Sequence, residues 1–121
     1  MKKALKNIGH TFDVEKNEIG VTIRKGTKWA EQSAVGESIE LWNCEKNHVG
    51  LCEEMGCEYC GSGVIVGWHV CHLKYLPVSL LKLEHNKEAR NMKVLKEMLE
   101  TGYGSISDSN TVTALIYLRT E

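Results

Sequence analysis

The residues best suited to bind a metal ion lie in the segment NCEKNHVGLCEEMGCEYCGSG (43–63), which holds four of the five cysteines in the chain. Two residues separate Cys57 from Cys60, a spacing at which two thiolates can bind one ion, and Gly61 permits a tight turn after them. The remaining ligands would come from the upstream part of the segment. The spacing therefore predicts a zinc site made by Cys44, Cys52, Cys57 and Cys60, with His48 as the alternative to Cys44.

The expected role of this zinc is structural. A catalytic zinc keeps one coordination position open, and nucleobase deaminases combine an H-x-E motif with P-C-x-x-C. None of the five histidines is followed two residues later by glutamate, and Gly56 rather than proline precedes Cys57. A redox role for the Cys57–Cys60 pair is disfavoured as well, because reactive pairs usually begin a helix, whereas this pair leads into a glycine turn and a strand pattern.

The same segment is acidic, which argues against contact with nucleic acid. It carries four glutamates against one lysine between the first and the last cysteine: Glu45, Glu53, Glu54 and Glu58 against Lys46. A phosphate backbone would be repelled by these charges and by metal-bound thiolates. Any nucleic-acid surface is therefore expected elsewhere, and the segment itself could serve a protein-interaction module that contacts a basic partner.

The best candidate for a ligand-binding surface is the stretch TIRKGTKW (22–29). Arg24, Lys25 and Lys28 surround Trp29 in a loop that contains glycine, and an indole ring beside cations can stack on a base. Lys2, Lys3 and Lys6 are the nearest other cations in the sequence. The alternative is that the lysines form a solvated surface and that the tryptophan packs at the rim of the core.

Length and composition fit one domain covering residues 1–121. The net charge of −1 gives no overall attraction to nucleic acid, so any such binding must be local. The chain has no signal-peptide pattern and no apolar run long enough to span a membrane. We therefore expect a cytoplasmic protein, with no membrane partner, in which clustered thiols stay reduced and act as ligands.

Residue patterns predict an α+β fold, mostly β with a late helix. Alternating or β-branched residues predict strands at 21–24, 38–42, 63–76 and 111–118, the third with a bulge at Gly67. Pro77 would open a helical turn. A longer helix is expected at 86–102, with Asn86 as N-cap, Gly102 as stop and an apolar stripe of Ala89, Met92, Leu95 and Leu99. The cysteine-rich loop, 43–62, reads as an insertion between two strands.

The order of these pieces resembles ASCH domains, which belong to the PUA-like β-barrels. In that family a "TIR" strand leads into a basic loop and then into a "vGd-x-hydrophobic-x-hydrophobic" strand, to which VGESIELW (35–42) is similar with Glu37 in place of the aspartate. The stretch YLPVSLLKLEHNKEARNMKVLKEMLETGYG (75–104) and the strand TVTALIYL (111–118) are similar to later parts of the family.

The resemblance covers most of residues 19–119 apart from the cysteine-rich loop. It implies a small barrel with a cleft beside the "TIR" strand that binds RNA, other single-stranded nucleic acid or a modified nucleotide. The ligand-binding residues would then be Thr22, Arg24, Lys25, Lys28 and Trp29.

A small bacterial amidohydrolase that acts on acetylcytidine is also similar, and it uses a lysine, a threonine and a glutamate in this cleft. The resemblance places Thr22 at the threonine and Glu88 approximately at the glutamate. A hydrolase would then use Thr22 with Glu88 or His85 bordering the same cleft. Ile19 stands at the position of the lysine. The sequence therefore favours a binding module over an enzyme, with hydrolysis of an acylated nucleoside as the alternative.

Overall fold

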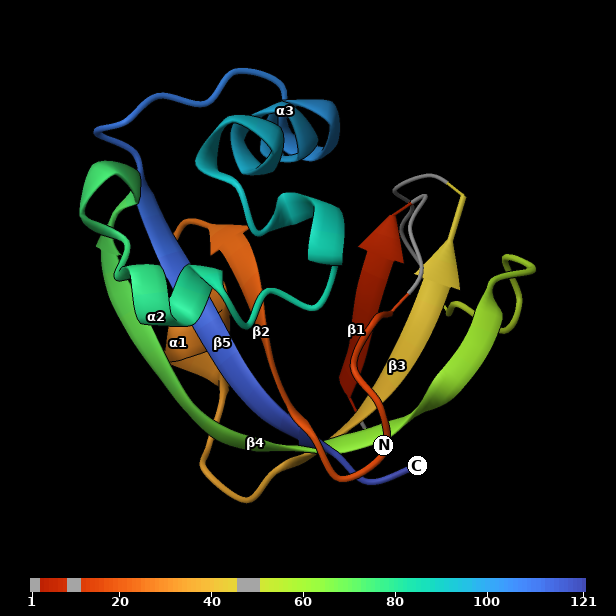
Figure 1. Cartoon of the computed structure of the whole chain (residues 1–121). Helices are drawn as coiled ribbons and strands as arrows, with labels where there is room; N and C mark the ends of the chain where they lie inside the picture. Colours follow the sequence, from red (N-terminus) through yellow and green to blue (C-terminus); the bar gives the residue numbers. More distant parts are fainter. Residues whose placement is uncertain (1–2, 9–11, 46–50) are drawn as a thin grey trace.

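A single curved sheet dominates the computed structural model, which describes residues 3–8, 12–45 and 51–121 (Figure 1). Its five strands lie in the order β1-β3-β4-β5-β2. The strands are β1 (Lys3–Ile8), β2 (Ile19–Lys25), β3 (Ser38–Cys44), β4 (Glu58–His72) and β5 (Thr111–Arg119). The helices are α1 (Lys28–Gln32), α2 (Val78–Leu81) and α3 (Met92–Tyr103), with 3₁₀ turns at Leu73–Tyr75 and Lys87–Ala89. The prediction of a mostly-β α+β protein with a late helix is confirmed.

Across the described residues the sheet is not closed into a barrel, so the expectation of a closed PUA-like barrel is wrong. β1 pairs with β3 in parallel, the other pairs are antiparallel, and β1 and β2 form the two edges. Instead of β1, the segment that follows α2 lies along β2. The amide of Val21 donates to the carbonyl of Leu83 over 2.8 Å, and the amide of His85 donates to the carbonyl of Val21 over 2.7 Å. This segment occupies the hydrogen-bonding edge that barrel closure would need.

Most predicted strands are recovered, with differences at their ends. β4 begins at Glu58, well before the predicted start, and ends at His72. Its pairing with β5 shifts register between Ile65 and Gly67, which agrees with the expected bulge. β1 was not predicted, because KALKNI has neither strict alternation nor turn residues that mark its ends.

The late helix starts later than predicted. α3 begins at Met92, and its N-cap is Asn91, whose side chain accepts hydrogen bonds from the amides of Lys93 and Val94. Asn86 was the predicted cap, but its side-chain amide is bonded to Asn7 instead. The helix continues past Gly102 and ends before Gly104, which has a positive φ of 84°.

The predicted apolar stripe packs as expected and fixes where the helix sits, although its first member, Ala89, lies in the 3₁₀ turn before α3. Ala89, Leu95 and Leu99 are buried in a cluster with Val21 and Ile23 of β2, and Met92 packs against the same cluster. Burial of each leucine is worth about 1.5–3 kcal/mol. α3 is thereby held beside β2, at the open side of the sheet (Figure 1).

No helix in the described part of the chain is long and apolar enough to cross a membrane.

Candidate metal centre and ligand cleft

Three cysteines converge where β3 ends and β4 begins. Cys44 is the last residue of β3, Cys52 lies in the connecting turn, and Cys57 immediately precedes β4. Their sulfur atoms lie within 4.8 Å of one another, and the Cys44 and Cys52 Sγ atoms are 3.8 Å apart. Cys44 and Cys52 are buried. This group could hold a metal ion.

Backbone hydrogen bonds in the turn bring Cys57 back to Cys52. The amide of Cys57 donates to the carbonyl of Cys52 over 3.0 Å, and the amide of Met55 donates to the carbonyl of Leu51 over 3.1 Å. Gly56 takes a φ of 74°, a left-handed conformation that glycine adopts without steric cost. Leu51 and Met55 are about half exposed, at 49% and 50%, so the turn has little apolar packing of its own.

The surroundings of Cys44 and Cys52 favour the protonated form of these two thiols. Burial raises the pKa of Cys44, and the neighbouring thiols of Cys57 and Cys52 add to that effect. Burial also raises the pKa of Cys52, although its hydrogen bond with Cys44 and, to a smaller extent, the positive charge of Lys6 act to lower that pKa. Metal binding would therefore displace protons from the sulfurs, and the affinity for the ion would rise with pH.

Cys60, the other predicted cysteine ligand, is not part of this group. Cys60 lies within β4, where its Sγ is 3.5 Å from the carbonyl oxygen of Glu58, and it packs against the core cluster that contains Leu41. His48 lies outside the described residues. The structure thus brings together three of the predicted cysteines, and the identity of a fourth ligand stays a prediction.

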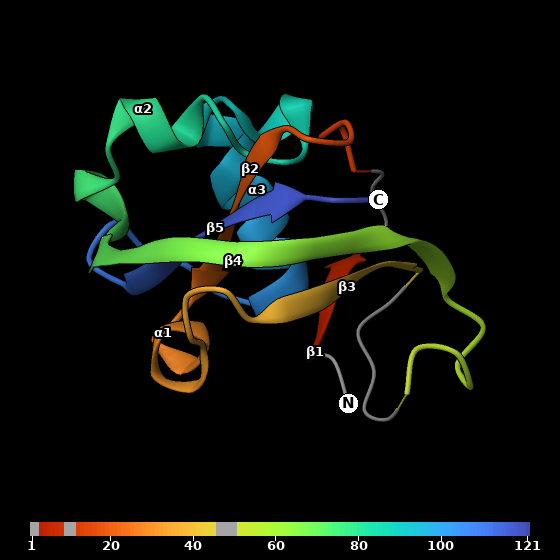
Figure 2. The same cartoon turned by 90° about the horizontal axis from the view of Figure 1, so that it is seen from below.

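The thiol turn lies far from the predicted ligand-binding loop. Figure 2 shows residues 51–57 extending beyond one end of β3 and β4, whereas α1 lies at the other end of the sheet. Glu53, Glu54 and Glu58 are exposed in this region. The acidic turn and the loop that leads into α1 therefore lie at different ends of the sheet (Figure 2).

A polar cavity of about 170 Å³ lies beside β2, and the edges of the sheet and the end of α3 contribute to its lining. Among its walls are Thr22 and Arg24, which project from the same face of β2 because they are two residues apart. Arg24 donates from Nε to the Thr22 hydroxyl over 3.0 Å and from Nη2 to the carbonyl of Lys6 over 2.7 Å. Arg24 therefore connects β2 to β1, the strand at the opposite edge of the sheet.

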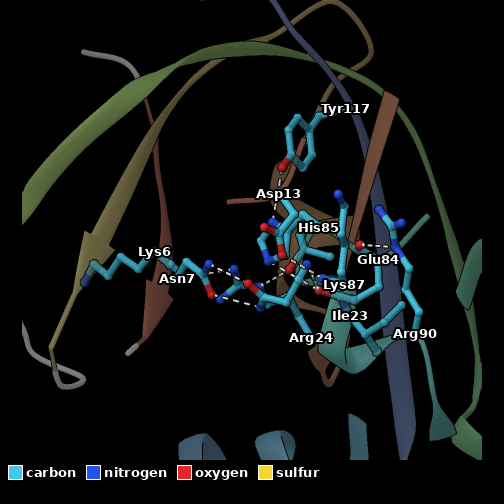
Figure 3. Close-up of polar contacts among 12 residues, drawn as sticks. Lys6, Asn7, Asp13, Ile23, Arg24, Glu84, His85, Lys87, Arg90 and Tyr117 are labelled. Atoms are coloured by element: carbon cyan, nitrogen blue, oxygen red, sulfur yellow. Dashed lines mark hydrogen bonds and ion pairs between the residues drawn. The ribbon is translucent and has the colours of Figure 1, made fainter. Parts of the chain in front are cut away.

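Glu84 supplies a buried carboxyl group to the wall of this cavity. Figure 3 shows Glu84 among its polar contacts. The side chain is buried, its Oε2 accepts from the amide of Ile23 over 3.2 Å, and its Oε1 accepts from the amide of Asn86 over 3.3 Å. Burial raises the pKa of Glu84 to about 7, while those two hydrogen bonds and the nearby charges of Arg24 and Arg90 act to lower it. A carboxyl group that titrates near neutral pH can act as a general acid or base.

Buried polar contacts hold the neighbouring walls in place. Asn7 and Asn86 exchange two amide hydrogen bonds, of 2.8 and 3.1 Å. The Nδ1 atom of His85 is 3.1 Å from the Tyr117 hydroxyl, and its Nε2 atom is 3.4 Å from Oε1 of Glu84. Each side-chain amide has a second N–H and a second carbonyl lone pair that the Asn7–Asn86 hydrogen bonds do not use. The cavity therefore combines fixed donors and acceptors with one titratable carboxyl.

The glutamate in the cavity differs from the one that the resemblance suggested. Glu88 is exposed in the 3₁₀ turn and does not line the cavity, whereas Glu84, four residues earlier, does. Sequence reasoning missed Glu84, Asn7 and Asn86 as a group. The only signal was the polar run Glu84-His85-Asn86 after an amphipathic stretch, and nothing in the sequence indicates that this run lies along β2.

A second hollow, of about 420 Å³, adjoins the first and is strongly basic; we call it the basic groove. Its cationic walls are Lys3, Lys6, Arg24, Lys25 and Lys28, and two aromatic residues, Trp29 and Tyr103, complete it. The groove shares Lys6, Arg24 and Tyr103 with the cavity. The predicted cluster of Arg24, Lys25, Lys28 and Trp29 is thus brought together, and Lys3 and Lys6 join it from β1.

Several groove side chains are positioned by contacts of their own. Lys3 forms an ion pair with Glu37 at 3.1 Å, and Lys25 donates to the carbonyl of Ser105 over 3.2 Å. Trp29 packs partly against the core, whereas the Tyr103 side chain is 43% exposed. Tyr103 was not predicted as a site residue, because its place depends on where α3 ends.

Ile19, which stands at the lysine position of the similar amidohydrolase, begins β2 and lines neither hollow. Two cations line both hollows, Lys6 of β1 and Arg24 of β2.

Comparisons of this chain with protein-family models, with curated proteins and with solved structures gave no match. The function therefore has to be inferred from the chemistry of the two sites.

Proposed function

We propose that this protein is a nucleic-acid-binding module that takes single-stranded RNA, or a modified nucleotide, in the basic groove. The observation that carries the proposal is the gathering of five cationic side chains and two aromatic rings around one hollow in a chain whose net charge is −1. Lysine and arginine supply the affinity for phosphates, and aromatic rings supply a stacking surface for bases.

The adjoining cavity suits a group the size of a single base. Its volume of about 170 Å³ is small compared with sites for drug-sized ligands, which span about 300–1,000 Å³. Sequence-specific RNA recognition commonly uses bases that have left the stack and form hydrogen bonds through their edges. Glu84, Asn7 and Asn86 supply such partners at the end of the groove.

Titration of a fluorescein-labelled single-stranded RNA of about 12 nucleotides, followed by fluorescence anisotropy at about 50 mM salt, tests the proposal. Lys28→Ala should weaken binding and reduce the salt dependence by about one in the slope of log K against log salt. Lys82→Ala is the matched control, because Lys82 is exposed and lines neither the groove nor the cavity. No binding by the unaltered protein at low salt would refute the proposal.

We also propose that the ion of the thiol cluster is zinc and that its role is structural. Thiolate ligands favour zinc or monovalent copper over magnesium and calcium, and structural zinc sites are commonly built from cysteines. Elemental analysis of protein purified without added metal should find about one zinc per chain. A preparation that contains no zinc and takes up none when zinc is added would refute this assignment.

A second candidate function is hydrolysis of an acylated nucleoside, and Glu84 is the observation that favours it. A buried carboxyl with a pKa of about 7 lies in the same cavity as the Thr22 hydroxyl and Lys6. In such a reaction Glu84 would accept a proton from the attacking water or hydroxyl and return it to the leaving amine.

Incubation with acetylcytidine, followed by chromatography, tests this candidate. Release of cytidine and acetate that is lost in Glu84→Gln and kept in Glu88→Gln would support it. Turnover that survives in Glu84→Gln, or no turnover by the unaltered protein, would exclude it.

A further inference from the structure

We propose that metal binding at the thiol cluster controls the basic groove, because the ion holds β1 in place through β3. This inference rests on the proposed function, since it concerns the regulation of the same groove. It connects two sites that lie on different parts of the sheet through one pair of strands.

β1 has fewer main-chain partners than the inner strands of the sheet. It has six residues, it lies at an edge, and within residues 3–8, 12–45 and 51–121 its main-chain ladder is with β3 alone. The pairing is parallel, which is slightly less stable per residue than antiparallel pairing. Short edge strands with one neighbour are among the first parts of a sheet to open locally. The position of β1 therefore depends on the integrity of β3.

β1 nevertheless carries a large share of the ligand-binding surface. Lys3 and Lys6 line the basic groove, and Lys6 and Asn7 line the cavity. On the side away from β3, β1 is linked to the rest of the protein by the bond from Arg24 to the Lys6 carbonyl and by the Asn7–Asn86 pair. Displacement of β1 would remove two of the five cations and one wall of the cavity.

The thiol cluster lies at the end of β3 that faces the end of β1. Cys44, the last residue of β3, is the register partner of Ile8, the last residue of β1. Cys52 and Cys57 belong to the turn that leads into β4. An ion bound to all three sulfurs would therefore cross-link the end of β3 to the start of β4, beside the terminal pair of β1 and β3.

This end of the β3–β4 hairpin needs such a cross-link. The register of β3 and β4 shifts between Leu41 and Trp42, so the last two pairs, Trp42 with Tyr59 and Asn43 with Glu58, lie beyond an irregularity. In the following turn, Leu51 and Met55 are half exposed and only Cys52 is buried among residues 51–57. Structural metal ions supply the cohesion of segments with so little core.

Two measurements on the whole chain test the inference, with and without one equivalent of zinc. Hydrogen exchange followed by mass spectrometry reports on β1 directly, and anisotropy with the labelled single-stranded RNA described above reports on the groove. The metal-free state is prepared both with a chelator and as Cys57→Ser. Cys71→Ser is the matched control, because Cys71 lies outside the three-cysteine group.

The expected result is faster exchange at residues 3–8 in both metal-free forms, with unchanged protection of β5 and α3. RNA affinity should fall at least about tenfold at low salt, with a salt slope smaller by about one to two, as lost contacts from Lys3 and Lys6 require. Cys71→Ser should behave like the unaltered protein in both measurements.

Other outcomes separate this inference from the proposed function. RNA binding that is equal with and without the ion would overturn the inference and leave nucleic-acid binding intact. Metal-dependent protection of β1 without RNA binding in either form would support the link from the ion to β1 and refute the proposed function. Loss of protection in β5 and α3 together with β1 would overturn the inference, because the ion would then support the whole fold.

Discussion

The side-chain amides of Asn7 and Asn86 donate to each other's oxygens, at 2.8 and 3.1 Å, and both residues are buried. The pair joins β1 to the segment that runs beside β2. It spans the opening between the two edges of the sheet, where a closed barrel would have main-chain hydrogen bonds. One reciprocal contact between side chains thus helps to define the cavity.

Removal of both partners of this pair should cost less stability than the two single removals added together. Asn7→Ala leaves the Asn86 amide buried and unsatisfied, so the free energy of unfolding should fall by about 1–3 kcal/mol, and Asn86→Ala should behave similarly. The loss of stability in the double variant should therefore be smaller than the sum of the two single losses. Urea unfolding of the four proteins measures this coupling, and additive losses would contradict it.

Stability should depend on the protonation of Glu84. Because burial raises its pKa to about 7, the folded state binds this proton more tightly than the unfolded state, where the pKa is near 4.5. The contribution of protonated Glu84 to the free energy of unfolding is therefore fully present below about pH 4.5. It is lost as the pH rises through about 7, and the loss is about 3 kcal/mol at most. Urea unfolding at several pH values should show this fall, and Glu84→Gln should flatten it. An equally steep fall in Glu84→Gln would assign the effect to another group.

Cys60 distinguishes a three-cysteine from a four-cysteine metal centre. Structural zinc takes four ligands, so Cys60→Ser should weaken zinc binding, although the Cys60 thiol must turn away from Glu58 to reach the ion. Cys44→Ser and Cys57→Ser should abolish binding. Competition with a chromogenic chelator measures all three affinities. Unchanged affinity in Cys60→Ser would show that the fourth ligand comes from elsewhere.

Tyr103 should contribute to nucleic-acid binding by stacking. The side chain is exposed at the junction of the groove and the cavity, so Tyr103→Ala should weaken binding of single-stranded RNA by about 1–3 kcal/mol with little change in stability. Tyr103→Phe keeps the ring and should bind nearly as well. Anisotropy titrations compare the variants, and equal losses in both would indicate that the hydroxyl rather than the ring makes the contact.

Residue periodicity predicted the elements whose formation depends on neighbouring residues in the sequence. The strands at 21–24, 38–42 and 111–118 were found because their periodicity is that of half-buried strands, and the stripe of α3 followed from helical spacing. The cluster of Arg24, Lys25, Lys28 and Trp29 was also predictable, since all four lie within six positions of one another.

Features that depend on distant partners were not predictable. The N-cap moved from Asn86 to Asn91 because the Asn86 amide bonds to Asn7, which lies 79 positions away. Glu84 enters the cavity because its segment bridges to Val21, and no local pattern indicates such a bridge. The spacing of Cys57 and Cys60 suggested that both thiols bind the same ion. Cys60 instead belongs to β4, where the alternation of the strand decides to which face its side chain points.

The strand order has a consequence for how the chain folds. β2 is the second strand in the chain, yet within the described residues its ladder partner is β5, which follows every other strand and helix. β5 also pairs along most of the length of β4. A nascent chain that lacks residues 111–119 would therefore hold β2 without a ladder partner and much of β4 half-paired. Such topology has high contact order, so folding should be slow and should be completed only after synthesis has passed β5.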